Sequence, residues 1–129
     1  IGFDLIKGGM AKYNLSAPIF LPSNVKPSFE RYLTFEGISV ENGKNYYMDA
    51  TVAYRQACLK AIDYLTHFGF TGSQAYMLLT AAPVEGRIGG IVDIPNCACT
   101  VSIPLSIFDQ DITPKGMLND KQYWGRLGK

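Results

Sequence analysis

Residues 32–48 have the sequence YLTFEGISVENGKNYYM, in which two runs of strand-forming residues flank a tight-turn signal. The first run is Tyr32–Val40 and the second is Asn45–Met48. Between them stands Asn42-Gly43, and these residue types best tolerate the positive φ angles that both central positions of a type I′ turn require. The stretch therefore predicts a β-hairpin in which the two runs pair.

The residues after this hairpin predict a long helix from about Thr51 to Phe68. Apolar residues recur there at three- and four-residue steps, which is the spacing of one helix face. The stripe consists of Tyr54, Cys58, Ala61, Leu65 and Phe68, widened by Ala57 and Ile62. Asp49 or Thr51 can cap the start of the helix, and Gly69 can end it in a left-handed conformation.

A second, shorter helix is predicted directly after the first. Thr71-Gly72-Ser73-Gln74 has the form of a capping box, in which the Thr hydroxyl accepts from the Gln amide and the Gln side chain reaches back. The helix must end by Ala82, because Pro83 disfavours helical geometry in the residue before it. Its near-continuous apolar run predicts burial on several sides.

The chain then returns to strand-forming sequence. Arg87–Val92 and Cys97–Ile103 are expected strands, joined by a turn at Asp93–Asn96. Pro104 is expected at an edge, and Leu105–Phe108 is expected to continue extended. The order strand, strand, helix, helix, strand, strand predicts an α+β fold, with a pair of helices inserted between antiparallel strands.

Length and composition are consistent with one domain that has a real core. The chain has 129 residues, 47% apolar and 18% charged, and its net charge of +1 excludes the basic footprint of a nucleic-acid binder. No apolar stretch is long enough for a membrane span. We expect an irregular lead-in over 1–30, a strand–helix–strand core over 31–112 and a polar tail over 113–129, held at the surface by Tyr123 and Trp124. Because the chain begins at Ile1 in what resembles the end of an element, we expect it to be a piece of something longer.

The cysteines and the histidine favour structural roles. Three cysteines stand at 58, 97 and 99, an odd number without the spacing of a disulfide framework, which fits a reducing cytosol. Cys97-Ala98-Cys99 is too tight for the usual zinc pattern, and His67 alone cannot complete such a site. His67 also lies near the end of the long helix, where its charge would interact favourably with the helix dipole.

Two places in the sequence offer polar groups for chemistry. Glu36 lies between apolar neighbours, so its carboxylate is either on the solvated face of the strand or partly buried with a raised pKa, as a general acid or base needs. Asp93 and Asn96 frame a tight turn, where both are ordinary turn residues. Gly89-Gly90 just before could let a ligand or another backbone approach closely, which puts a candidate site near this turn.

Several motifs together resemble the C-terminal part of the acetamidase/formamidase family, and formamidases more than acetamidases. The motifs are Arg31–Gly37, Tyr47–Cys58, Ala82–Ile88 and Gly90–Asn96, and they occur in the family's order. The likeness covers roughly residues 2–112. It implies a β-sandwich-type fold with packed helices, in a cytoplasmic homo-oligomer that hydrolyses formamide or another short aliphatic amide to a carboxylate and ammonia.

The resemblance also implies roles for individual residues. Glu36 and Asp93 would act as acid/base groups or orient other groups, Asn96 would hydrogen-bond the amide, and Arg55 would hold a carboxylate. A divalent metal, with zinc as the expected ion, would have its ligands in the upstream portion of the same protein, outside this chain. Cys97-Ala98-Cys99 departs from the expected family pattern, which weakens the case for a nucleophilic cysteine.

Two alternatives remain open at this point. The chain could be a non-catalytic structural or interface portion of such a protein, or an unrelated small binding module. In none of these readings is a nucleic acid or a membrane a partner.

Overall fold

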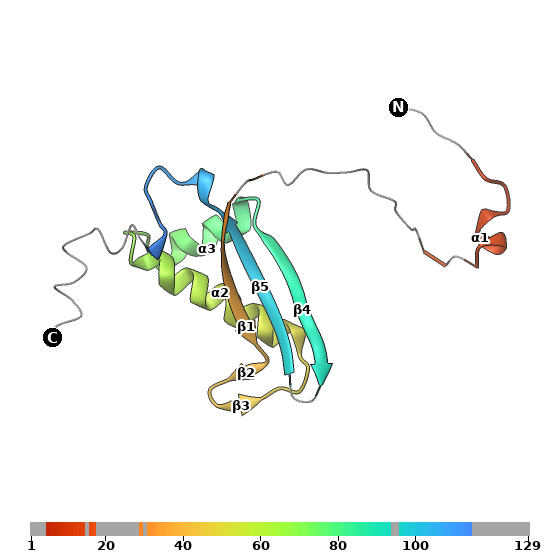
Figure 1. The fold of residues 1–129 in the computed structure, drawn as a ribbon, viewed down its shortest axis with the longest axis horizontal. Coiled ribbons are helices and arrows are strands. Elements are labelled where there is room, and N and C mark those ends of the chain that lie inside the picture. Colours follow the sequence, from red (N-terminus) through yellow and green to blue (C-terminus); the bar gives the residue numbers. More distant parts are fainter. Residues whose placement is uncertain (1–4, 15, 18–28, 30, 94–95, 115–129) are drawn as a thin grey trace.

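A computed structural model describes residues 5–14, 16–17, 29, 31–93 and 96–114 (Figure 1). A four-residue helix, α1 (Gly9–Lys12), precedes the main body. The body consists of β1 (Tyr32–Ile38), β2 (Val40–Glu41), β3 (Lys44–Asn45), α2 (Ala50–Thr66), α3 (Gly72–Ala81), β4 (Glu85–Asp93), β5 (Asn96–Pro104) and the 3₁₀ turn η1 (Leu105–Ile107). No helix among these described residues is long and apolar enough to cross a membrane.

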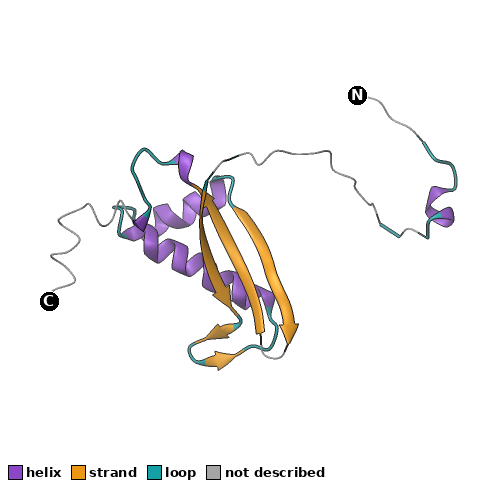
Figure 2. Ribbon diagram, in the orientation of Figure 1, coloured by secondary structure: helices purple, strands orange, loops and turns teal. Residues whose placement is uncertain are grey.

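The centre of the fold is an antiparallel sheet with the strand order β1-β5-β4 (Figure 2). The long helices α2 and α3 lie against one face of this sheet, and the other face is open within the described residues. The helix pair comes between β3 and β4 in the chain, so the predicted α+β class with inserted helices is confirmed.

The predicted turn is correct, but the predicted strand pairing is only partly so. Asn42 and Gly43 have φ angles of 52° and 76°, as a type I′ turn requires. The hairpin that they close is short, because only β2 and β3 pair. The longer strand β1 pairs instead with β5, from Tyr32 opposite Pro104 to Ile38 opposite Ala98. The run after the turn is a strand only as far as Asn45, after which the chain approaches α2.

Helix α2 begins and ends where the sequence predicts. Both the Thr51 and Val52 backbone N–H groups donate to the Asp49 carboxylate, at 2.9 and 3.1 Å, and Gly69 has a φ of 90° after the last turn. The buried stripe is Val52, Ala53, Ala57, Ala61 and Leu65. Ala57, Ala61 and Leu65 are buried as expected. At the start of the helix the stripe is rotated by about one residue, so Ala53 is buried and Tyr54 is 41% exposed.

The rotation has a steric cause at the crossing of α2 and β1. A Cβ atom on Gly37 would lie 2.1 Å from the Ala53 carbonyl oxygen and 2.3 Å from the Ala57 nitrogen. The helix backbone therefore approaches β1 closely, and only glycine on the strand and alanine on the helix fit between them.

Helix α3 has the predicted capping box but not the predicted burial. The Thr71 hydroxyl accepts from the Gln74 N–H, and the Gln74 side chain accepts from the Thr71 N–H. Within this helix Ala75 alone is buried, whereas Tyr76 and Met77 are largely exposed. An apolar run shows that burial would be favourable on several sides of a helix. In this structure α3 packs against α2 and the core on one side only.

Strands β4 and β5 confirm the two expected strands and extend them. The register shifts at two points, between Ile88 and Gly90 and between Ile91 and Asp93, which are β-bulges in β4. Pro104 ends the central strand rather than lying at an edge, and the segment expected to be extended after it forms the turn η1. The turn residues Ile94 and Pro95 lie outside the described residues.

The main core lies between α2, α3 and the sheet. It consists of Ala57, Ala61, Leu65, Ala75, Val101, Ile103 and Ile112. The Tyr64 hydroxyl donates to the Ile112 carbonyl oxygen, which fastens the end of the expected core segment to α2. Tyr123 and Trp124, expected to hold the tail, lie outside the described residues.

Candidate functional site

Glu36 is exposed on the open face of the sheet. Residues of β1 alternate in direction, and Gly37 points at α2, so its neighbour points away from the helices. The backbone oxygen of Glu36 accepts from Lys60 Nζ at 2.9 Å across the free edge of β1. Of the two environments that the sequence allows for this carboxylate, the structure shows the solvated one.

Asp93 and Asn96 are brought together at one end of the sheet. They are register partners that close the β4–β5 pair, and Asn96 is exposed. Glu36 is opposite Thr100, four residues further along β5, which is about 13 Å at strand spacing. The structure therefore joins two of the expected residues and keeps Glu36 apart from them.

Arg55 holds a carboxylate that belongs to this chain. Its Nε and Nη2 atoms donate to the two Glu41 carboxylate oxygens at 3.1 and 2.9 Å, and Gln56 Nε2 donates to the same group at 3.1 Å. This two-pronged ion pair fastens β2 to α2, on the helix side of the sheet. A direct contact of Arg55 with a substrate stays a prediction.

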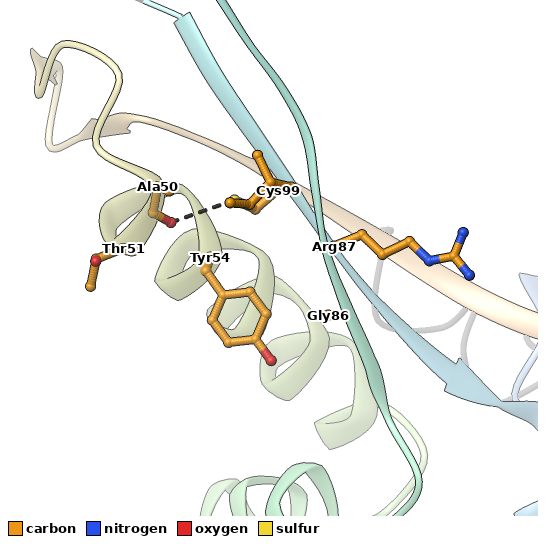
Figure 3. Close-up of a pocket in the computed structure, with 7 residues that line it drawn as sticks. Ala50, Thr51, Tyr54, Gly86, Arg87 and Cys99 are labelled. Atoms are coloured by element: carbon orange, nitrogen blue, oxygen red, sulfur yellow. Dashed lines mark hydrogen bonds between the residues drawn. The ribbon is translucent and has the colours of Figure 1, made fainter. Parts of the chain in front are cut away.

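The sequence did not identify a pocket that opens between the first turns of α2 and strand β4 (Figure 3). Its volume is about 450 Å³, and it is lined by Ala50, Thr51, Tyr54, Gly86, Arg87, Ile88 and Cys99. The Cys99 thiol donates to the Ala50 carbonyl oxygen at 3.5 Å on its inner wall. The Tyr54 ring lies against Gly86, where an added Cβ would come within 2.7 Å of Cε2. The tyrosine can adopt this position because the strand has a glycine there.

The tyrosine and the thiols around this pocket are held in their neutral forms. Loss of hydration raises the pKa of Tyr54 above 10.0, and the neighbouring Cys58 thiol raises it further. Burial likewise raises the pKa of the Cys58 and Cys99 thiols above 9.0. Thiolates are the nucleophilic form of cysteine, so neither thiol is activated at neutral pH. The pocket can donate and accept hydrogen bonds, but these groups cannot act as its base or nucleophile.

The loop that leads into α2 carries backbone strain beside the pocket. Tyr47 and Met48 have positive φ angles of 24° and 62°, although neither is glycine. The Asp49 N–H donates to the Tyr46 carbonyl oxygen at 3.0 Å and closes the loop. Such strain persists only where surrounding contacts enforce it, and it is concentrated at functional contact sites. A sequence pattern gives no signal for it, since both side chains are ordinary strand formers.

The described residues do not fit a divalent metal. Nowhere in the described ranges do three or more His, Cys, Asp or Glu side chains come together in a way that could hold an ion. A protein zinc site needs at least three such ligands, so the described residues do not form a complete site by themselves.

Comparison with known proteins adds to this geometry. The model of the Acetamidase/Formamidase family matches residues 1–110. A formamidase of Methylophilus methylotrophus is 55% identical over 115 residues, which cover 88% of this chain and 28% of that protein. An acetamidase of Mycolicibacterium smegmatis is 55% identical over 103 residues, which cover 74% of this chain and 25% of that protein.

A solved structure shares the fold as well as the sequence. The gamma lactamase from Delftia acidovorans is 59% identical, with a TM-score of 0.78 over 84% of this chain and 27% of that protein. The chain thus spans about a quarter of the length of the proteins it matches. With the family model matched over most of its length, this chain belongs to the acetamidase/formamidase family.

Proposed function

We propose that the protein containing this chain hydrolyses the C–N bond of formamide or another short aliphatic amide, giving a carboxylate and ammonia. The observation that carries the proposal is the 55% identity to a formamidase over 115 residues. The names of the other relatives refer to acetamide and to a lactam, which are also amides. Water supplies the second oxygen of the carboxylate. One of its protons goes to the leaving nitrogen to give ammonia, and the other is released when the carboxylic acid ionises and converts ammonia to ammonium.

This reaction needs a base for the attacking water and an acid for the leaving nitrogen. The neutral tyrosine and thiols of the α2–β4 pocket do not supply a base. We propose Asp93 for one of these roles, with Asn96, its register partner in the sheet, hydrogen-bonding the amide. Because Glu36 lies about 13 Å further along the sheet, it would orient other groups from the open face rather than act on the same amide. Zinc held by residues outside this chain would polarise the amide carbonyl.

The assembly and location of the protein are part of the same proposal. We propose a homo-oligomer, as the family resemblance implies, and a cytoplasmic location, which is consistent with the three free thiols at Cys58, Cys97 and Cys99. Free thiols persist most readily in a reducing compartment. Native mass measurement and cell fractionation test these two points separately from the activity.

A chimeric enzyme tests the activity directly. The section of the Methylophilus methylotrophus formamidase that matches this chain is replaced by the chain itself, and ammonia release from formamide is measured. We expect activity, because more than half of the exchanged residues are identical. A chimera with the native mass and melting temperature of the parent but without ammonia release contradicts the proposal.

Single substitutions in that chimera test the residue roles. We expect Asp93→Asn to lower kcat by about 100-fold or more, the usual contribution of a positioned acid or base. Glu36→Gln, at an orienting group, should lower kcat by a smaller factor. The matched controls are Asp109→Asn and Asp63→Asn, which remove a carboxylate charge from other parts of the chain and should leave kcat unchanged. If both test variants keep full activity, the chain has a structural role and the acid/base groups lie elsewhere in the protein.

A further inference from the structure

The helix layer leaves the distal half of β4 uncovered. Ile88 is the register partner of Cys99, and Ile91 is the partner of Cys97. Paired residues point to the same face of a sheet, so both isoleucines point to the face that carries α2. Both cysteines are almost fully buried, whereas the isoleucines are 60% and 50% exposed. On this face of the sheet, α2 therefore shields β5 from water, whereas the neighbouring strand β4 is exposed to solvent.

The topology explains why no described helix covers this part of β4. Helix α2 crosses β1 and β5, and its close approach at Gly37 fixes it there. Helix α3 ends at Ala81, directly before the start of β4 at Glu85, so it lies toward the other end of that strand (Figure 1). Ile88 and Ile91, the register partners of Cys99 and Cys97, therefore lie in the part of β4 that neither helix covers.

The α2–β4 pocket extends this exposed surface inward. Ile88 lines the pocket, and Tyr54 forms the wall beside it at 41% exposure. We call these residues, together with Ile91, the β4 strip. The one charged lining residue is Arg87, whose Nη2 donates to the Glu85 carboxylate at 2.9 Å. The strip therefore presents apolar side chains around a recess and no unpaired charge.

We propose that the β4 strip is the surface on which the remaining section of the family protein packs, and that an apolar side chain from that section fills the pocket. Nearly three quarters of the length of the matched relatives lies outside the section that corresponds to this chain. A chain segment of that length must contact this one, and an apolar, half-covered sheet face is where such contact removes most apolar surface from water. The inference rests on family membership and not on the proposed activity.

Cysteine labelling of the same chimera tests the proposal. Ile88→Cys is introduced on a Cys58→Ala background, since Cys97 and Cys99 are buried and the remaining native thiol is partly exposed. Labelling by a maleimide is followed in the isolated 129-residue chain and in the chimera. We expect rapid labelling in the isolated chain and protection by about tenfold or more in the chimera.

A matched position on the opposite face shows which surface is covered. Glu36→Cys is also exposed in the isolated chain, but it lies on the open face of the sheet. Protection of position 88 supports the proposal, with or without protection of position 36. Equal labelling of position 88 in chain and chimera overturns it, as does protection at position 36 alone. Protection that rises with the concentration of the isolated chain also overturns it, because a second copy would then be the occupant. Ammonia release is not needed for any of these readouts.

Discussion

The neighbouring strands β5 and β4 carry similar apolar residues on the same face of the sheet, but these residues differ greatly in burial. In β5, Cys97, Cys99, Val101 and Ile103 are at most 1% exposed, because α2 lies directly over them. In β4, Ile88 and Ile91 point to the same side and remain half exposed. The strands differ in what lies over them rather than in their own apolar character. Burial of β5 beneath α2 stabilises the folded chain. The exposed apolar residues of β4 indicate which surface contacts another segment.

The largest expected effect is at the closest contact of the covered region. Gly37→Ala puts a Cβ within 2.3 Å of two backbone atoms of α2, neither of which can move without moving the helix. We expect loss of the folded state, beyond the about 1–3 kcal/mol that overpacking a deformable site costs. Circular dichroism during urea unfolding measures this. Gly72→Ala is the matched control, because nothing lies within 4 Å of its added methyl group, and it should be neutral or slightly stabilising.

The same truncation in both strands measures the difference between them. Ile103→Ala removes a fully buried side chain and should lower the free energy of unfolding by about 2–5 kcal/mol, including the cavity that it leaves. Ile88→Ala removes one that is 60% exposed, so in the isolated chain its cost should be below about 1 kcal/mol. Equal costs in urea unfolding would mean that β4 is covered in the isolated chain, and the comparison would be wrong.

A smaller effect is expected at the start of the helix that covers β5. Asp49→Ala removes the acceptor of two backbone N–H groups and should lower the free energy of unfolding by about 1 kcal/mol. Asp49→Asn keeps an oxygen in the same place and serves as the control, with a smaller loss expected. If the alanine variant is as stable as the parent chain in thermal unfolding, the cap does not limit the stability of α2.

The parts of this fold that the sequence predicts are those that depend on near neighbours in the chain. The Asn42-Gly43 turn, the Asp49 cap and the Thr71 capping box each involve residues within four positions of one another. Their hydrogen bonds and dihedral angles form whatever the rest of the chain does. For the same reason, the helix ends were predicted to within about two residues.

The pairing of β1 and the pocket could not be predicted because they depend on residues far apart. β1 pairs with a strand more than sixty positions away, and the hydrophobic alternation that both strands show does not specify a partner. The pocket exists because Tyr54 lies against Gly86, a contact between two elements for which neither residue gives a local signal. Exposure of Tyr76 and Met77 was missed because an apolar run indicates that burial is favoured but not that a partner is present.

The smallest expected effect concerns the thiol beneath α2, and it appears only at alkaline pH. Burial raises the pKa of Cys99 above its ordinary 9.0, so the folded state favours the neutral thiol. The stabilisation is complete below the unfolded pKa and is lost as the pH rises through the higher folded value. We therefore expect the free energy of unfolding to decline above about pH 9, and less steeply in Cys99→Ala. The control is Thr100→Ala, at the next position of β5. This substitution removes no ionisable group, so the variant should show the full decline. Identical alkaline profiles for the parent chain and Cys99→Ala would contradict this prediction. They would mean that the Cys99 thiol is hydrated in the folded chain and that α2 does not exclude water from β5.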